Sequence, residues 1–238
     1  MLINGDISGL EWVCAAYLSQ DPIAIKEILA EFDQHSDNQK RFKLPTRLVA
    51  KTFVFRLIYG GSAWSYSNDP AFASVKGSEK FWQNVIDQFY DKYKGLHNWH
   101  IKLVQEVTQS GRLIMPTGRI YTYTKNHKGE WPRTTILNYP VQGLGADLMM
   151  IGRISFYRRL KASNLTGLLV SSIHDSLVVD CLDKDNKTCY NICKILKESI
   201  EDIPKNFERL FKVKFNLPMR SEISFGPNKK DMEIWVEK

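Results

Sequence analysis

The sequence lacks the long apolar runs and leader segments that mark membrane and secreted proteins. No apolar stretch in its 238 residues approaches the roughly 20 that a membrane-spanning helix needs, and no signal peptide precedes Asp6. Internal repeats and low-complexity tracts are absent as well. We therefore expect a cytoplasmic protein that does not act on a membrane.

Cysteine is scarce, and its spacing does not match a metal site. The four cysteines are Cys14, Cys181, Cys189 and Cys193, and none forms a C-x2-C pair. Cys189 and Cys193 are four apart in a helical pattern, so one helix face should carry both. A zinc site would need further ligands nearby. Reduced, partly buried thiols are the better interpretation in a cytoplasmic chain.

Acidic residues are too few to balance the basic ones. The chain has 33 Lys and Arg against 26 Asp and Glu, which gives a net charge of +7. This excess favours a polyanionic partner, although charge alone does not identify one. The hydrophobic share of 43% fits a globular chain of one or two domains.

Hydrophobic periodicity predicts an α+β fold with a helical insertion. We expect strands at 1–6, 213–225 and 232–236, and hairpins at 111–123 and 168–179. Helices are expected at 10–18, 22–31, 46–59, 78–110 with a break near Gly95, 140–160, and once or twice within 187–212. The polar segment 33–43 resembles a loop.

Two aspartates stand at predicted strand ends. Asp175 follows His174 in a turn from Ser171 to Ser176, and Asp6 ends the opening strand. Attack of a hydroxyl on a phosphate is assisted by two divalent ions roughly 4 Å apart, held by carboxylates. Asp6 and Asp175 suit that task if their strands are neighbours; otherwise each merely ends a strand or turn, as Asp often does.

A cationic and aromatic stripe lies on the predicted helix 46–59. Arg47, Lys51, Phe55 and Tyr59 are spaced four apart, which keeps them near one face. Cations near a helix start can hold phosphates, and the two rings offer surfaces for a base or sugar. The alternative is an ordinary amphipathic helix with core rings and solvated cations.

These segments together resemble family A (DNA polymerase I-like) DNA polymerases. Asp6-Ile7-Ser8-Gly9-Leu10-Glu11 is similar to motif A, the stripe followed by Gly60 to motif B, and His174-Asp175-Ser176 to motif C. The order of the motifs also matches. The stretch from Asn138 to Asp147 resembles the family's N-x-P-x-Q-G-x-x-A-D segment, and Ser110-Gly111-Arg112 or Pro116-Thr117-Gly118-Arg119 resembles its G-R segment.

The resemblance implies a fold, a reaction and partners. It predicts a palm with an antiparallel sheet at 1–19 and 136–238, and mainly helical fingers at 20–135. It implies template-directed DNA synthesis from dNTPs on primer–template DNA, with two Mg²⁺ ions for which Mn²⁺ can substitute. The chain begins five residues before Asp6, so we expect the thumb and exonuclease to be absent here and supplied by a second chain or by the rest of a longer one. Divergence from cellular enzymes fits a phage or plasmid genome, in which case the location is the host cytoplasm.

The same resemblance assigns roles to individual residues. Asp6 and Asp175 would hold the metal ions together with the Ile7 carbonyl, and Lys51 would act catalytically by protonating pyrophosphate. The implied nucleotide-binding residues are Glu11, which excludes a 2′-hydroxyl, and His35, Arg47, Lys51, Phe55 and Tyr59. The implied DNA-binding residues are Arg119, Asn138, Gln142 and His174.

Several positions depart from the family pattern, and two other functions stay open. Ser176 replaces a Glu of motif C, Ile7, Gly9 and Trp12 replace residues of motif A, and Val54 and Arg56 replace small or polar residues of motif B. A non-catalytic nucleic-acid-binding remnant is the main alternative. A metal-dependent nuclease is less favoured, because the stripe suits a nucleoside triphosphate better than a scissile backbone.

Overall fold

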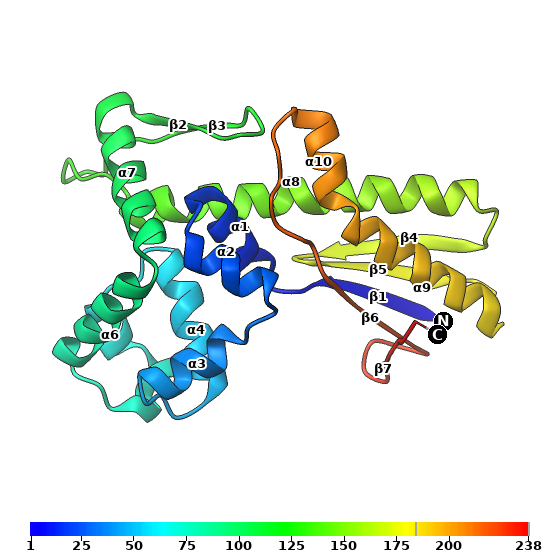
Figure 1. The fold of residues 1–238 in the computed structure, drawn as a ribbon, viewed down its shortest axis with the longest axis horizontal. Helices are drawn as coiled ribbons and strands as arrows, with labels where there is room; N and C mark the ends of the chain where they lie inside the picture. Colours follow the sequence, from blue (N-terminus) through cyan, green and yellow to red (C-terminus); the bar gives the residue numbers. More distant parts are fainter. Residues whose placement is uncertain (184, 238) are drawn as a thin grey trace. The chain divides into compact units, whose positions relative to one another are not determined.

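The computed structural model describes residues 1–183 and 185–237, which divide into two compact units (Figure 1). We call the first, Met1–Leu10 together with the chain from Leu144 onward, the sheet unit. We call the second, Glu11–Gly143, the helical unit. The long helix α8 (Arg133–Ala162) contributes residues to both.

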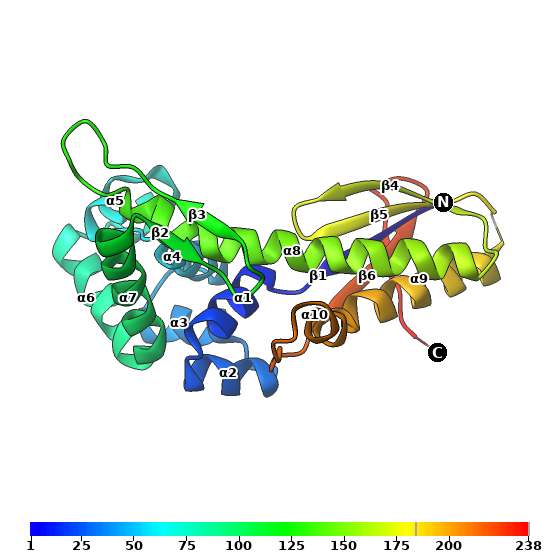
Figure 2. The ribbon, with the colours of Figure 1, turned by 90° about the horizontal axis from the view of Figure 1, so that it is seen from above.

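The sheet unit is built on a five-stranded antiparallel sheet in the order β4-β5-β1-β6-β7. Its strands are β1 (Leu2–Ile7), β4 (Gly167–Ile173), β5 (Ser176–Cys181), β6 (Ser221–Gly226) and β7 (Glu233–Ile234). The first strand of the chain therefore lies between two strands from its second half. Helices α9 (Asn186–Glu201) and α10 (Ile203–Phe211) complete the unit, and α9 lies along the sheet in both views (Figures 1 and 2).

One face of β1 is buried and the other is not. Ile3, Gly5 and Ile7 are buried and alternate with partly exposed Leu2, Asn4 and Asp6, as the two-residue period of a strand requires. Helix α9 approaches the buried face closely: a Cβ placed on Gly5 would lie 2.7 Å from Leu196 Cδ2. The close packing fixes which side of β1 Asp6 occupies.

The helical unit contains short helices around an aromatic core. The elements are α1 (Leu10–Ser19), α2 (Pro22–Leu29), α3 (Gln34–Arg41), α4 (Arg47–Ile58), α5 (Ala63–Asn68), the 3₁₀ helix Pro70–Val75, α6 (Glu79–Lys92), α7 (Lys94–Ser110) and the hairpin β2 (Arg112–Ile114) and β3 (Ile120–Thr122). Phe53 of α4 stacks on Trp82 with ring centroids 5.8 Å apart, and Tyr66 stacks on the same ring at 5.1 Å. This core anchors the inner side of α4.

The α+β fold is confirmed, with several local corrections. The predicted loop at 33–43 is wrong, because Asp33 caps α3 by accepting hydrogen bonds from the His35 and Ser36 amides. The predicted strand at 213–225 is ordered as a strand only from Ser221.

The other corrections concern lengths. Helix α8 begins at Arg133 and continues through Pro140, whose neighbours Leu137 and Val141 are fully buried; this packing outweighs the hydrogen bond lost at proline. The turn between β4 and β5 consists of His174 and Asp175 alone. The helices at 63–75 were not predicted. The boundaries of palm and fingers remain a prediction.

The structure also bears on the cysteines and on the expected lack of a membrane-spanning helix. All four cysteines are buried and free of disulfides, and Cys189 and Cys193 both face the interior from α9. Over the part of the chain that the structure describes, no helix is long and apolar enough to cross a membrane.

Candidate functional site

The two predicted metal ligands lie at the same end of neighbouring strands. Strands β1 and β5 pair antiparallel, with Asp6 opposite Ser176. Beyond the last pair, the Ile7 amide donates a hydrogen bond to the Asp175 carbonyl at 2.9 Å. The strand adjacency that the two-carboxylate hypothesis requires is therefore present, although the residues are separated by most of the chain.

The hairpin that carries Asp175 is closed by a strained residue. His174 has a φ of 52°, a left-handed conformation that non-glycine residues adopt at an energetic cost. The Ser176 hydroxyl donates a hydrogen bond to the Ile173 carbonyl at 3.0 Å. Ser176, which stands where the family has Glu, therefore stabilises the turn with its hydroxyl.

Asp6 has a second acidic neighbour that the sequence pattern did not reveal. On its other side, β1 pairs with β6 so that Glu222 stands directly opposite Asp6. Directly opposite residues share a face of the sheet, so Glu222 adds negative charge beside Asp6. No local signal marks Glu222, because its relation to Asp6 depends on the register of strands more than 200 residues apart in the chain.

The donor chemistry at this sheet end fits magnesium. Carboxylates are the hard oxygen donors that Mg²⁺ prefers, and one or two are enough when phosphates and waters complete the octahedron. Within residues 1–183 and 185–237, no group of three or more His, Cys, Asp or Glu side chains is arranged to hold a metal ion. Asp6 and Asp175 supply two carboxylates at this sheet end, a number that is sufficient for Mg²⁺ when phosphates and waters complete its coordination.

The predicted cationic and aromatic stripe lies on the outer side of α4. Thr46 caps the helix by accepting a hydrogen bond from the Val49 amide at 3.2 Å. The core positions are Ala50, Phe53, Val54, Leu57 and Ile58, whereas Arg47 and Lys51 are exposed and Phe55 and Tyr59 are partly exposed. The two rings are therefore not core residues of this helix.

Helix α3 brings two further side chains to the start of α4. The Asp33 carboxylate accepts hydrogen bonds from Arg47 Nε at 2.9 Å and from Arg47 Nη2 at 3.1 Å. This guanidinium holds the pKa of Asp33 well below its usual range. Asp33 thereby orients Arg47, a role that the sequence did not predict because it depends on the unexpected helix α3.

His35 joins the same cluster from the first turn of α3. Its ring centroid lies 5.8 Å from that of Phe55, and the Lys51 ammonium lies 5.5 Å from the Phe55 ring centroid. Burial, followed by the positive charges of Arg47 and Lys51, lowers the pKa of His35 to about 4. Its Nδ1 is buried without a hydrogen-bond partner among the described residues. Four of the predicted nucleotide-binding residues thus form one cluster.

Tyr59 at the end of α4 connects two other predicted residues. It accepts a hydrogen bond from Gln142 Nε2 and is hydrogen-bonded to Glu11. Burial first, and then the Glu11 charge, raise the pKa of Tyr59 well above its ordinary value. Tyr59 is therefore a protonated hydrogen-bond donor at neutral pH. Glu11, Tyr59 and Gln142 form a second cluster.

The remaining predicted DNA contacts lie in both units. Asn138 and Gln142 are four apart on α8 and so lie on one side of it. The hairpin β2–β3 packs on α8 so closely that a Cβ at Gly143 would lie 3.4 Å from Arg119 Cδ. His174 is exposed at the tip of the β4–β5 turn in the sheet unit.

The model of the family "DNA polymerase family A" matches residues 1–231 of the chain. The chain belongs to DNA polymerase family A.

Relatives of this family A chain include cellular and phage enzymes. It is 25% identical over 212 residues to DNA polymerase I of Aquifex aeolicus, covering 85% of this chain and 36% of that protein. It is 24% identical over 188 residues to the DNA polymerase of Bacillus phage SP01, covering 76% of this chain and 20% of the phage protein. The chain thus spans about a third or less of the length of these relatives.

A solved structure has the same fold. It is described as the POL domain of Pol1 from M. smegmatis in complex with DNA primer-template and dNTP. The TM-score is 0.77 at 20% identity, and the match covers 94% of this chain and 39% of that one. The family A fold therefore extends over nearly the whole chain.

Packing accounts for three departures from the family motifs. Trp12 is buried and packs its ring against Tyr93 and Phe89, with centroids 5.1 Å and 6.4 Å away. Val54 is fully buried in the core side of α4. Arg56 pairs with Asp69 and lies 5.2 Å from the Phe72 ring centroid. Trp12 and Val54 therefore belong to the core of the helical unit, and Arg56 connects α4 to the segment that contains Asp69 and Phe72.

Proposed function

We propose that this family A chain carries out template-directed DNA synthesis, transferring nucleotides from dNTPs to a primer 3′-hydroxyl. The observation that carries the proposal is the placement of Asp6 and Asp175 at one end of the adjacent strands β1 and β5. Family membership over residues 1–231 supports the same reaction. The main alternative is a remnant that binds nucleic acid without catalysis.

Asp6, Asp175 and the Ile7 carbonyl are the proposed ligands of two Mg²⁺ ions. When bound, the ions lower the pKa of the attacking hydroxyl and neutralise the charge that develops on the phosphate oxygens. Mn²⁺ also prefers oxygen ligands and should substitute. Glu222 is not proposed as a ligand; its charge lies beside Asp6 and raises the local attraction for cations.

The cluster on α3 and α4 is the proposed triphosphate-binding site. Arg47 and Lys51 would hold the phosphates, and Lys51 would donate a proton to the departing pyrophosphate. His35 would contact the triphosphate, and Phe55 would stack near the sugar. The exposure of Arg47 and Lys51 next to partly exposed Phe55 supports these roles, because ligand-binding side chains must be accessible.

The Glu11–Tyr59–Gln142 cluster is the proposed site of sugar and template control. Glu11 would exclude a 2′-hydroxyl, and Tyr59 would guard the templating position. Gln142, with Arg119, Asn138 and His174, would contact the primer–template. The hydrogen bonds that join Tyr59 to Glu11 and Gln142 support a coupled arrangement of these side chains.

The proposal concerns the palm and fingers part of a polymerase. The relatives are longer than this chain by a factor of about 2.5 to 4, as the aligned lengths and coverages indicate. We propose that thumb contacts, on this polypeptide or on a second chain, supply much of the affinity for duplex DNA. Phosphate contacts dominate such affinity and weaken with salt, so the catalytic part alone should act weakly and best at low salt.

Single-nucleotide incorporation tests the proposal. Purified chain, a saturating primer–template, dNTP and Mg²⁺ at low salt should give slow incorporation of the templated nucleotide. Asp6→Asn and Asp175→Asn should reduce the rate by about a thousandfold or more, because a carboxylate ligand is replaced by a neutral amide. Asp180→Asn is the matched control on β5, since Asp180 lies at the opposite end of the strand, opposite Leu2.

Two outcomes contradict the proposal. If the wild-type chain binds the primer–template but incorporates no nucleotide even with a thumb-containing partner, the non-catalytic alternative is favoured. If Asp6→Asn retains the wild-type rate, the two-carboxylate site is wrong.

A further inference from the structure

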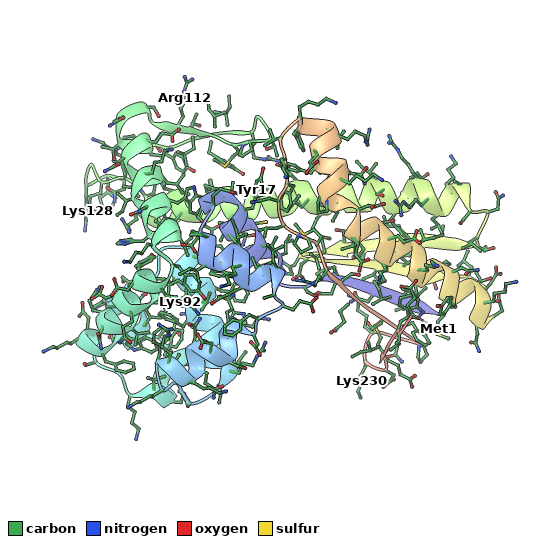
Figure 3. All side chains as sticks on the ribbon, viewed as in Figure 1. Met1, Tyr17, Lys92, Arg112, Lys128 and Lys230 are labelled. Carbon is green, nitrogen blue, oxygen red and sulfur yellow. The ribbon has the colours of Figure 1, made fainter. Side chains whose placement is uncertain are left out.

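A buried lysine joins three helices of the helical unit. Lys92, labelled in Figure 3, ends α6, and its side chain is only 10% exposed. Its ammonium forms an ion pair with Glu27 Oε1 on α2 at 2.8 Å and donates a hydrogen bond to Asp37 Oδ2 on α3 at 2.9 Å. A cation this deeply buried requires charged partners, and its partners come from two different helices.

Aromatic groups enclose the same ammonium. The Lys92 nitrogen lies 5.4 Å from the Phe32 ring centroid and 4.9 Å from that of Tyr93. The Tyr93 hydroxyl donates a hydrogen bond to Glu27 Oε2 at 2.6 Å. Burial, with the Glu27 hydrogen bond as the second cause, raises the pKa of Tyr93 well above its usual value. Both oxygens of Glu27 are therefore engaged.

Lys92 is the residue that neutralises the two carboxylates of this group. One ammonium lies between two carboxylates whose side chains are 14% and 31% exposed. Without the ammonium, Glu27 and Asp37 would repel each other with little solvent to screen them. Removing one partner of a buried ion pair is strongly destabilising because the remaining charge is left uncompensated. Arg41 Nε, 3.9 Å from Asp37 Oδ2, is the other cation near Asp37 among the described residues. Loss of Lys92 should therefore push α3 away from α2.

Helix α3 is polar along its own length, and its apolar anchor is the cap residue Phe42, which is buried and packs on Phe53 with ring centroids 5.8 Å apart. Its eight residues, QHSDNQKR, include no aliphatic side chain and only one aromatic ring, that of His35, and its buried residues are Gln34 and Asn38. A helix of this length is unstable in isolation. The side chains of the helix itself are therefore held by polar contacts, and the ion pair between Asp37 and Lys92 is the most buried of its ion pairs.

Helix α3 also carries side chains of the triphosphate-binding cluster. Its first turn contains His35, and its cap Asp33 orients Arg47. We infer that Lys92 is a positioning residue for nucleotide binding: it holds α3 so that Asp33 and His35 meet the start of α4. This inference rests on the proposed role of Arg47 and His35 as triphosphate-binding residues.

Binding of inorganic tripolyphosphate to the full chain tests the inference, because this probe lacks base and sugar. Lys92→Met keeps the aliphatic stem and removes the charge. It should weaken binding by about fivefold or more, which corresponds to roughly 1 kcal/mol. Lys80→Met removes an exposed charge from the same helix α6 and should leave the dissociation constant within about twofold of wild type. An equal loss in both variants would show a general charge effect and overturn the inference.

A double-mutant cycle separates positioning from a general loss of structure. If Lys92 acts through Asp33 and Arg47, then adding Lys92→Met to an Arg47→Met variant should change the dissociation constant for tripolyphosphate by less than about twofold. A full fivefold effect in that background would overturn the inference. If Arg47→Met binds the probe as wild type does, the proposed triphosphate role fails. If Arg47→Met weakens binding and Lys92→Met does not, only the Lys92 inference fails.

A charge-neutral variant covers the case in which Lys92→Met does not fold. The triple variant Glu27→Gln, Asp37→Asn and Lys92→Met removes the ammonium together with both carboxylates, so no buried charge is left unpaired. It should fold and still bind tripolyphosphate several times more weakly than wild type, because amide contacts hold α3 less firmly. Wild-type affinity in this variant would overturn the inference.

Discussion

The close packing of α9 on β1 predicts the outcome of adding a single methyl group. Gly5 precedes Asp6, and a Cβ at Gly5 would lie 2.7 Å from Leu196 Cδ2, 2.8 Å from Leu196 Cγ and 3.1 Å from Ile223 Cδ1. Only a rotation about χ1 of Leu196 would move its Cγ atom, and the side chain has little room to rotate because it is fully buried in a close-packed core. Gly5→Ala should therefore force β1 and α9 apart.

The magnitude follows from two opposing terms. Overpacking a core typically costs about 1–3 kcal/mol, and replacing glycine by alanine in a strand recovers about 0.5–1 kcal/mol. The free energy of unfolding should thus fall by up to about 2.5 kcal/mol. Leu196→Ala alone should cost about 2–5 kcal/mol, because Leu196 is fully buried and leaves a cavity.

The double variant gives the sharper test. In the Leu196→Ala background the contact is absent, so Gly5→Ala should be neutral or stabilising by up to about 1 kcal/mol. Urea denaturation of the four proteins gives the coupling energy, and hydrogen exchange of the β1 amides localises it. Gly152→Ala, whose Cβ would meet Ile203, is the control for additivity. If Gly5→Ala is equally destabilising with and without Leu196, the packing argument is refuted.

Two further predictions concern the helical unit. Asp21 is buried and accepts hydrogen bonds from the amides of Ile23, Ala24 and Leu96 at 2.9–3.1 Å. Asp21→Ala should lower the unfolding free energy by about 2–4 kcal/mol in urea titrations, because a helix cap is lost and buried donors are left unpaired; a loss below about 1 kcal/mol would contradict this role. Burial, with smaller effects of Arg133 and His97, lowers the pKa of His100 to about 3. In the unfolded chain His100 takes up a proton near pH 6.5, whereas in the folded chain it stays neutral. The contribution of neutral His100 to the free energy of unfolding is therefore complete above about pH 6.5. It should decline by up to about 1.4 kcal/mol per pH unit as the pH falls toward 3, and a His100→Gln variant with an unchanged slope would contradict the assignment.

The features that the sequence predicted correctly are those that depend on a few neighbouring residues. The stripe from Arg47 to Tyr59 predicted a helix with an accessible cationic and aromatic side, and α4 has this arrangement. Alternation and turn residues predicted the hairpins at 111–123 and 168–179. Motif order predicted the family, which the match over residues 1–231 confirms. These features need only the period of a helix or strand.

The predictions that failed required distant contacts. Residues 33–43 have no apolar period, so nothing local indicates α3; it is ordered by its Asp33 cap, by Arg47 and by the buried Lys92. Strand 213–225 was overestimated because Phe215, Leu217 and Met219 are buried in an irregular segment and not in a strand.

By itself, the sequence determined the chemistry that is available: two strand-end carboxylates, a helix with a cationic and aromatic side, and the order of three family motifs. Only the tertiary structure decided which residues meet. It placed β1 between β5 and β6, so that Asp6 lies opposite Ser176 and Glu222, and it set Asp33 against Arg47. The physical reason is that strand register and buried polar pairs depend on contacts between residues far apart in the chain, whereas periodicity records only the neighbourhood of each residue.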